Sequence, residues 1–157
     1  MLHIRIIAVG RLKESFWRDA CAEYSKRLKP YANVSVVELP DADPTRVGGD
    51  DQAVSREGEA ILKALLPDEF PILLDIGGKR MSSPGIAHAL EELPLAGVND
   101  VALIIGGSCG VSAEVRQRAR ARWSLGDITL PHNLARVVLL EQVYRAFKIQ
   151  RGEPYHK

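Results

Sequence analysis

Five short apolar runs alternate with segments of helical pattern along the whole chain. The runs are rich in Val, Ile and Leu, which favours β-strands, and they span residues 2–9, 34–39, 70–76, 100–106 and 124–130. Runs 70–76 and 100–106 are apolar without alternation, as expected of central strands buried on both faces. Strands that alternate with helices form a mostly parallel sheet covered by helices on both faces. The sequence therefore predicts an α/β fold of this kind, with five to six strands, as a single domain over residues 1–157.

The segments between these runs carry recognisable helix signals. Amphipathic patterns predict helices over residues 13–28 and 55–66. Three further helices are predicted to begin at N-cap residues, which are Ser83 followed by Pro84, Ser112 and Asn133. The polar segment 41–51 is predicted to be a loop.

Cysteine content and hydropathy limit the class of protein. The two cysteines are far apart, and no CxxC motif or Cys/His cluster suggests a disulfide framework or a zinc site. The apolar N-terminus is short and interrupted by His3 and Arg5, and no stretch is long enough to cross a bilayer. We therefore expect a cytoplasmic protein in a reducing compartment, with no membrane partner.

Positive charge is concentrated in the last third of the chain. Residues 1–100 hold 12 basic and 16 acidic side chains, whereas residues 101–157 hold 9 basic and 4 acidic ones. Such a local excess suits a polyanionic partner, with chance segregation of surface charge as the alternative.

The four arginines of RQRARAR, residues 116–122, fall on different sides of one helix. They could form a single stripe only if that helix ended or bent.

Three segments at the ends of predicted strands are candidates for a ligand site. They are Gly77–Arg80 and Gly106–Gly110, which follow predicted strands, and Leu125–His132, which lies around the last predicted strand. In open parallel sheets, ligands bind outside the carboxyl ends of the strands, where such loops and helix N-termini converge. No P-loop is present, and no GxGxxG motif follows the first strand, which disfavours a nucleoside triphosphate or a dinucleotide.

One of these loops also permits a different chemistry. The sequence GGSCG at 106–110 matches the nucleophile elbow of serine hydrolases, and Ser108, Asp127 and His132 or His156 follow in the hydrolase order. The chain is short for that architecture, and a helix that starts near Ser112 leaves a loop where the elbow needs a helix. A hydrolase that uses Ser108 is therefore the alternative.

The last predicted helix has an unusually wide apolar surface. Val137, Leu139, Leu140, Val143, Tyr144, Ala146 and Phe147 cover an arc of about 200° at 100° per residue. A helix on one sheet needs about half of that arc, so the surplus suggests the same helix of a second protomer. Arg136 falls near the middle of the arc and needs a partner, which could be a carboxylate, backbone carbonyls or an anionic substrate.

Several segments together resemble a known family over nearly the full length of the chain. They are AVGRLKESFW, EYSKRLKPY, ILLDIGGK, LIIGGSCG, LPHNLARVVLLEQVYRAFKI and RGEPYHK. The chain resembles the RlmH-type (YbeA-type) SPOUT methyltransferases. The resemblance implies a homodimer that uses S-adenosylmethionine to methylate N3 of pseudouridine 1915, in the helix 69 loop of 23S rRNA in assembled ribosomes. It also implies a deep trefoil knot near the C-terminus, which sequence patterns do not predict.

The resemblance also assigns roles to individual residues. The methyl donor is expected to contact Leu74, Gly106, Gly107, Leu125, Gly126, Asp127, Ile128, Thr129 and Leu130. The candidates for substrate positioning and proton removal are His132, Arg136, Tyr155 and His156, with the tail completing the site of the facing protomer. Arg136 is hypothesised to bind an RNA phosphate or the target base. No metal is needed for this chemistry, and a non-catalytic RNA-binding dimer is the second alternative.

Overall fold

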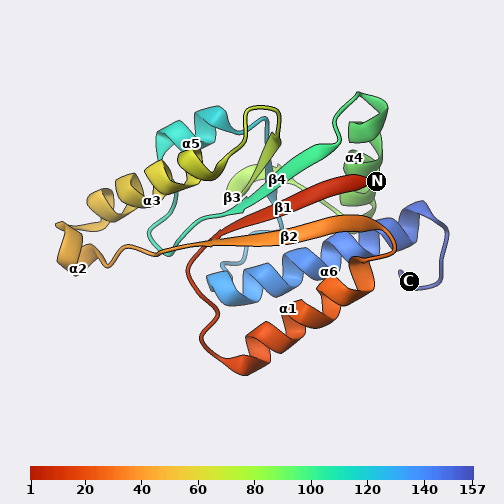
Figure 1. The fold of residues 1–157 in the computed structure, drawn as a ribbon, viewed down its shortest axis with the longest axis horizontal. Coiled ribbons are helices and arrows are strands. Elements are labelled where there is room, and N and C mark those ends of the chain that lie inside the picture. The colour runs from red at the N-terminus through yellow and green to blue at the C-terminus, as the bar shows by residue number, and fades with distance from the viewer.

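A five-stranded parallel sheet forms the centre of the molecule (Figure 1). The computed structural model describes residues 1–157. The strands are β1 (Leu2–Val9), β2 (Ala32–Leu39), β3 (Phe70–Arg80), β4 (Asp100–Ile105) and β5 (Ala121–Ser124). Their order is β2-β1-β4-β3-β5, and every neighbouring pair is parallel. The predicted α/β fold with a parallel sheet is confirmed, while the trefoil knot stays a prediction.

Helices cover both faces of this sheet (Figure 1). The larger core cluster joins one face to α1 (Ser15–Leu28), α4 (Ser83–Leu95) and α6 (His132–Gln150). The smaller cluster joins the other face to α3 (Asp50–Ala64) and α5 (Ala113–Arg118). A further short helix, α2 (Pro44–Val47), lies within the segment predicted as a loop, and the Asp43 side chain caps it by accepting a bond from the Thr45 amide.

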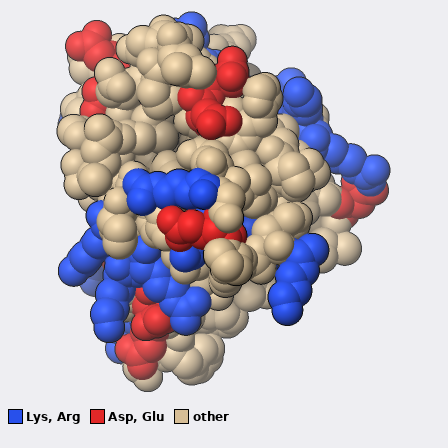
Figure 2. Space-filling view, turned by 90° about the vertical axis from the view of Figure 1, so that its right-hand side faces the viewer, with Lys and Arg blue, Asp and Glu red and all other residues tan.

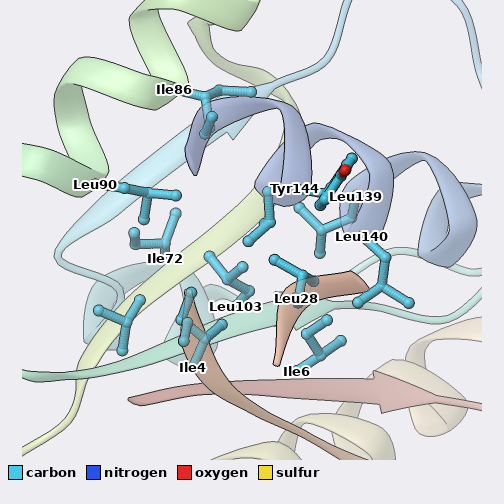
Figure 3. Close-up of a cluster of buried hydrophobic side chains, with 14 of the residues drawn as sticks. Ile4, Ile6, Leu28, Ile72, Ile86, Leu90, Leu103, Leu139, Leu140 and Tyr144 are labelled. Carbon is cyan, nitrogen blue, oxygen red and sulfur yellow. The ribbon is translucent and has the colours of Figure 1, made fainter. Parts of the chain in front are cut away.

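The alternation of side chains along the inner strands creates these two cores. In β4, Val101, Leu103 and Ile105 face the larger cluster, whereas Ala102 and Ile104 face the smaller one. Figure 3 shows how Leu103 lies among side chains from β1, β3, α1 and α6. Because both faces are buried, the strand sequence is apolar without polar interruptions, as the sequence predicts.

Helix α6 lies between α1 and α4 on one face of the sheet. Its apolar side chains from Leu139 to Phe147 are already buried within one chain. The width of the arc therefore gives no support to the suggested contact with a second protomer, because two neighbouring helices and the sheet cover these side chains. The homodimer stays a prediction that rests on other grounds.

The prediction of a strand over residues 124–130 was wrong. The edge strand β5 ends at Ser124, and Gly126 turns the chain with a φ of +127°. Residues 125–130 form a loop whose Ile128 side chain is exposed. The RQRARAR segment is divided between two elements. Arg116 and Arg118 lie in α5, Arg122 lies in β5, and Arg120 lies in the connection between them.

Four helix starts differ from their predictions. Helix α1 begins at Ser15 instead of residue 13, and α3 begins at Asp50 instead of residue 55, so its first turn lies partly in the segment predicted as a loop. Helix α4 begins one residue earlier than predicted, because Ser82 is its N-cap and accepts a bond from the Gly85 amide. Helix α6 begins at His132 after Pro131, and its N-cap has no side-chain hydrogen bond, so Asn133 is not the cap. Ser112 caps α5 as predicted. No helix combines the length and the hydropathy needed to span a bilayer.

Candidate active site

A pocket of about 510 Å³ opens where the carboxyl ends of β3, β4 and β5 meet the start of α6. Of the nine residues predicted to contact the methyl donor, all except Asp127 line this pocket. They are Leu74, Gly106, Gly107, Leu125, Gly126, Ile128, Thr129 and Leu130. His132 also lines the pocket. Such a volume and such an apolar wall suit a small organic ligand.

A second hollow, of about 630 Å³, lies near the opposite ends of the strands. Four of its charged side chains already have partners within the chain, since His3 contacts Asp100 and Arg5 contacts Glu69 at 2.5 Å. Strand-to-helix loops converge on the first pocket rather than on this hollow. The pocket at the carboxyl ends is therefore the candidate functional site.

Gly106 and Gly107 give the pocket its floor beside β4. A Cβ atom at Gly106 would clash with Val111, and a Cβ atom at Gly107 would lie 3.0 Å from Glu57 Cδ and closer still to Glu57 Oε1. Neither position has room for a side chain without a shift of the loop. The two glycines therefore bring backbone close to the space that a ligand would occupy.

Asp75 links the end of β3 to two of the clustered arginines. Its carboxylate accepts bonds from Arg116 at 3.4 Å and from Arg122 at 3.2 Å, and from the Gly77 amide at 3.1 Å. Burial opposes ionisation of this group, but the Gly77 amide and the arginines outweigh it and lower the pKa of Asp75. Asp75 and Arg116 both line the pocket, and each neutralises the charge of the other.

Asp127 does not line the pocket, although its neighbours do. Its exposed carboxylate is paired with Arg80, which donates from Nε at 3.2 Å and from a second nitrogen. This ion pair ties the 125–130 loop to the extended end of β3. The side chain of Asp127 is thus a surface contact of the loop and not part of the wall.

Arg136 lies beneath the site and has partners within its own chain. Its side chain is 3% exposed, and it donates to Glu38 Oε2 at 2.7 Å and to the Gly10 carbonyl at 3.0 Å. The sequence predicted a carboxylate, carbonyls or a substrate, and the first two are present. Its Nε atom has no partner. A role in binding RNA would require the pair with Glu38 to open.

Tyr155 and His156 lie against the middle of α6. The Tyr155 hydroxyl donates to Glu141 at 3.1 Å, and Arg145, which is paired with Glu141, lies 3.2 Å from His156 Nδ1. Burial, followed by the Glu141 hydrogen bond, raises the pKa of Tyr155 to about 12. Glu141 is two and a half turns beyond His132, about 13 Å along the helix axis. These contacts therefore hold Tyr155 and His156 away from the pocket of their own chain.

The hydrolase arrangement is not assembled. The Ser108 hydroxyl oxygen lies 4.0 Å from Cys109 Sγ, Asp127 is paired with Arg80, and His156 contacts Arg145. Helix α5 begins five residues after Ser108, so the strand and the helix are separated by a loop. No oriented nucleophile and base are present, as a nucleophile elbow requires.

Basic and aromatic side chains gather around the tail. The guanidinium groups of Arg27, Arg145 and Arg151 lie over tyrosine rings at 4.5 to 5.9 Å, and Lys148 lies over two tyrosines. Figure 2 shows blue side chains clustered with red ones on the lower part of the face that contains the chain ends. Most of these cations are paired with acids, for example Lys148 with Glu153 at 2.6 Å.

Sequence reasoning missed three groups at the site, namely Glu57, Asp75 and Arg116. Asp75 follows a buried strand, so its position was a usable signal. Glu57 gave no signal, because it belongs to an ordinary amphipathic helix and becomes buried only when α3 packs beside the Gly107 loop. No cluster of His, Cys, Asp and Glu side chains is placed to hold a metal ion.

Comparison with known proteins identifies one family. The family profile described as "Predicted SPOUT methyltransferase" matches residues 2–156. The chain is 48% identical over 160 residues to "Ribosomal RNA large subunit methyltransferase H" of Desulfitobacterium hafniense (strain DSM 10664 / DCB-2), with 100% of both chains covered. It is 44% identical over 159 residues to the protein of the same name from Streptococcus gordonii, covering 99% of this chain and 100% of the relative.

A solved structure shares the fold at low identity. "The structure of a probable methylase family protein from Haemophilus influenzae Rd KW20" is similar with a TM-score of 0.55 and 15% identity. The alignment covers 98% of this chain and 70% of that one. At this identity the similarity shows the arrangement of strands and helices and nothing finer.

Proposed function

Because the chain belongs to the SPOUT methyltransferase family, we propose that it transfers a methyl group from S-adenosylmethionine to large-subunit ribosomal RNA. The observation that carries this proposal is the pocket beside Gly106 and Gly107, whose walls contain nearly all the residues expected to contact the donor. The names of the full-length relatives support ribosomal RNA as the acceptor.

The residues of the pocket fit the methyl donor. Apolar side chains such as Leu74, Leu125 and Leu130 offer surface for a nucleoside, while the glycine-lined backbone beside them offers amides and carbonyls. When bound, the donor would supply a sulfonium that makes its methyl group electrophilic. The protein must then align the acceptor, exclude water and accept the acceptor's proton.

We propose His132 as the group that accepts the proton, at a ring nitrogen. It is the histidine that lines the pocket, and it stands at the first position of α6. The proposed target atom is N3 of a pseudouridine in the helix 69 loop of 23S rRNA in assembled ribosomes. An imide N–H has to lose its proton as the new bond to carbon forms, so a nearby base is required.

We propose that the active protein is a homodimer in the cytoplasm, in which the tail of one protomer completes the site of the other. Tyr155 and His156 are held by Glu141 and Arg145, away from the pocket of their own chain. A symmetric dimer repeats each contact twice and would give two composite sites. The basic and aromatic side chains beside the tail would then lie near the RNA.

Mixing of inactive variants tests the composite site. Protomers with His132→Ala and protomers truncated after Pro154 are expected to be inactive alone. After exchange of subunits in an equal mixture, about a quarter of the wild-type methyl transfer should return, because half of the dimers hold one intact site. No recovery, with mixed dimers verified by mass spectrometry, would rule out a site shared between protomers.

Truncation also separates chemistry from donor binding. Removal of residues 155–157 is expected to lower the rate of methyl transfer by about 100-fold, the usual effect of losing a positioning or acid–base group. Affinity for S-adenosylmethionine, measured by calorimetry, should stay within about twofold because the tail is not part of the pocket. Removal of Lys157 alone is the matched control and should leave both quantities unchanged.

The form of the RNA substrate is tested by radiolabelled methyl transfer to ribosomes, free large subunits and naked 23S rRNA in parallel. We expect labelling of assembled ribosomes. Labelling of naked rRNA alone would exclude the proposed preference for assembled ribosomes.

Arg136→Ala in a folded dimer tests the hypothesis that this arginine binds RNA. A wild-type rate of methyl transfer to ribosomes would contradict that hypothesis.

Two other functions make different predictions. A hydrolase that uses Ser108 would react with a fluorophosphonate and would not bind S-adenosylmethionine. A non-catalytic RNA-binding dimer would bind rRNA and transfer no methyl group. Calorimetry with S-adenosylmethionine is expected to give micromolar binding, which supports the methyltransferase over both.

A further inference from the structure

Glu57 of α3 is buried against the loop that lines the pocket. The residue is 5% exposed, and its Oε2 atom accepts a hydrogen bond from the Ala42 amide at 2.9 Å. Its Oε1 atom has no hydrogen-bond partner. The same oxygen is the atom that a side chain at Gly107 would meet first. The carboxylate thus lies directly beside the backbone of a residue in the pocket wall.

A buried oxygen without a partner is costly, so its presence calls for an explanation. Burial raises the pKa of Glu57 most strongly, the Ala42 amide lowers it, the charge of Asp41 raises it and His132 lowers it. Asp41 and His132 are the titratable groups that face it, from the loop after β2 and from α6. The net effect is a raised pKa, which means that the protein alone does not fully compensate a negative charge here.

Two other carboxylates near the pocket are already neutralised. Asp75 is paired with Arg116 and Arg122, and Asp127 is paired with Arg80. Glu57 forms no ion pair with a lysine or an arginine. Asp41, which faces Glu57 from the loop after β2, also has no ion pair but is exposed to solvent. Glu57 is therefore the buried acid at this site whose charge is available to attract a cation in the pocket.

We propose that Glu57 is a selectivity residue that favours the cationic methyl donor over its neutral product. This inference rests on the proposed function. When the methyl group leaves, sulfur keeps the electron pair of the broken S–C bond, so the sulfonium becomes an uncharged thioether. A negative charge beneath Gly107 attracts the donor more than the product, which assists the exchange of product for new donor.

The test is calorimetry of Glu57→Gln with S-adenosylmethionine and S-adenosylhomocysteine. Because Gln keeps the shape and removes the charge, affinity for the donor should fall about tenfold, as expected for one charge pair several ångströms apart. Affinity for the product should change by less than about threefold. Glu59→Gln, an exposed position on the same helix, is the matched control and should change neither affinity.

The outcomes separate this inference from the proposed function. Equal changes in both affinities, or no change in either, would overturn the role of Glu57 and leave the methyltransferase intact. Failure of the wild-type protein to bind either ligand would overturn the proposed function and this inference with it.

A second measurement needs no variant. Carbon-13 NMR of the Glu57 carboxyl group gives its pKa in the free protein and with each ligand bound. A nearby cation favours the ionised carboxylate, so the pKa should be lower with the donor than with the product. The same pKa in the two complexes would overturn the proposal.

Discussion

Replacement of Gly107 with valine is expected to abolish detectable binding of S-adenosylmethionine, a loss of at least about 100-fold in affinity. The first atom of the new side chain would already meet the carboxyl group of Glu57. Because α3 and the β4 end are held by the sheet and its core, the loop has to move into the pocket to relieve the clash. Calorimetry of the purified variant measures the loss.

Gly77→Ala is the matched control for this substitution. Gly77 is exposed near the same pocket, and a Cβ atom there would meet only Asp75, at 3.7 Å, which is an ordinary contact distance. Donor affinity should therefore stay within about threefold. If the valine variant is folded by circular dichroism and binds the donor as tightly as the wild type, the pocket beside Gly107 is not the donor site.

Removal of Glu38 is expected to destabilise the protein by about 3 kcal/mol, because Arg136 would keep its charge in a buried position without its anion. Glu38→Ala isolates this effect, and the free energy of unfolding by urea measures it. Since Glu38 also accepts a weak bond from the Leu12 amide at 3.3 Å, part of the loss reflects that contact.

Arg136→Met should cost less than Glu38→Ala, because a partly exposed carboxylate can be solvated whereas a buried guanidinium cannot. The double variant should be more stable than Glu38→Ala alone. If Glu38→Ala unfolds at the same urea concentration as the wild type, the pair is not a structural element, and Arg136 returns as a candidate for binding RNA.

The same ion pair gives stability a defined pH dependence. Burial raises the pKa of Glu38, but the hydrogen bond from Arg136 and its charge lower it by more. The pKa of Glu38 in the folded protein therefore lies below its usual value. The contribution of the ionised group is therefore complete above the unfolded pKa of about 4.3 and is lost as the pH falls through the folded pKa. The difference in stability between wild type and Glu38→Ala should shrink below about pH 4. A constant difference down to pH 2 would contradict this sign.

The sequence predicted the inner strands well because burial on both faces leaves an unmistakable pattern. β4 is apolar after Asp100, β1 is apolar apart from His3 and Arg5, and both appear where expected. The third inner strand, β3, begins as predicted but continues to Arg80, so the prediction of a loop over Gly77–Arg80 was wrong. The edge strand β5 has four residues and contains Arg122, so nothing in its composition distinguishes it from the helix before it. The apolar residues of 124–130, which resemble a strand in sequence, belong instead to a loop that lines the pocket. Ile128 in this loop is exposed and is not part of an alternating strand pattern.

The candidate site was predictable where it depends on the ends of strands and not where it depends on packing between distant elements. Gly106 and Gly107 follow from the end of a predicted strand and from the family resemblance. Residues 125–130 were wrongly predicted as a strand, and the family resemblance assigned them to the donor site. The burial of Arg136 followed from the helical wheel, but its pairing with Glu38, 98 residues away, did not. The apolar arc of α6 is as wide as the sequence predicted, and α1 and α4 cover it. A helical wheel shows which side chains are apolar but not which elements pack against them.

We propose that this pocket holds the donor whose methyl group is transferred to ribosomal RNA, and mass spectrometry of nucleosides tests this transfer. Ribosomes that lack the modification are incubated with the protein and S-adenosylmethionine, and their 23S rRNA is then digested. We predict one new N3-methylated pseudouridine per large subunit, absent when the Gly107→Val protein is used. No new methylated nucleoside, or the same yield from the valine variant, would contradict the account.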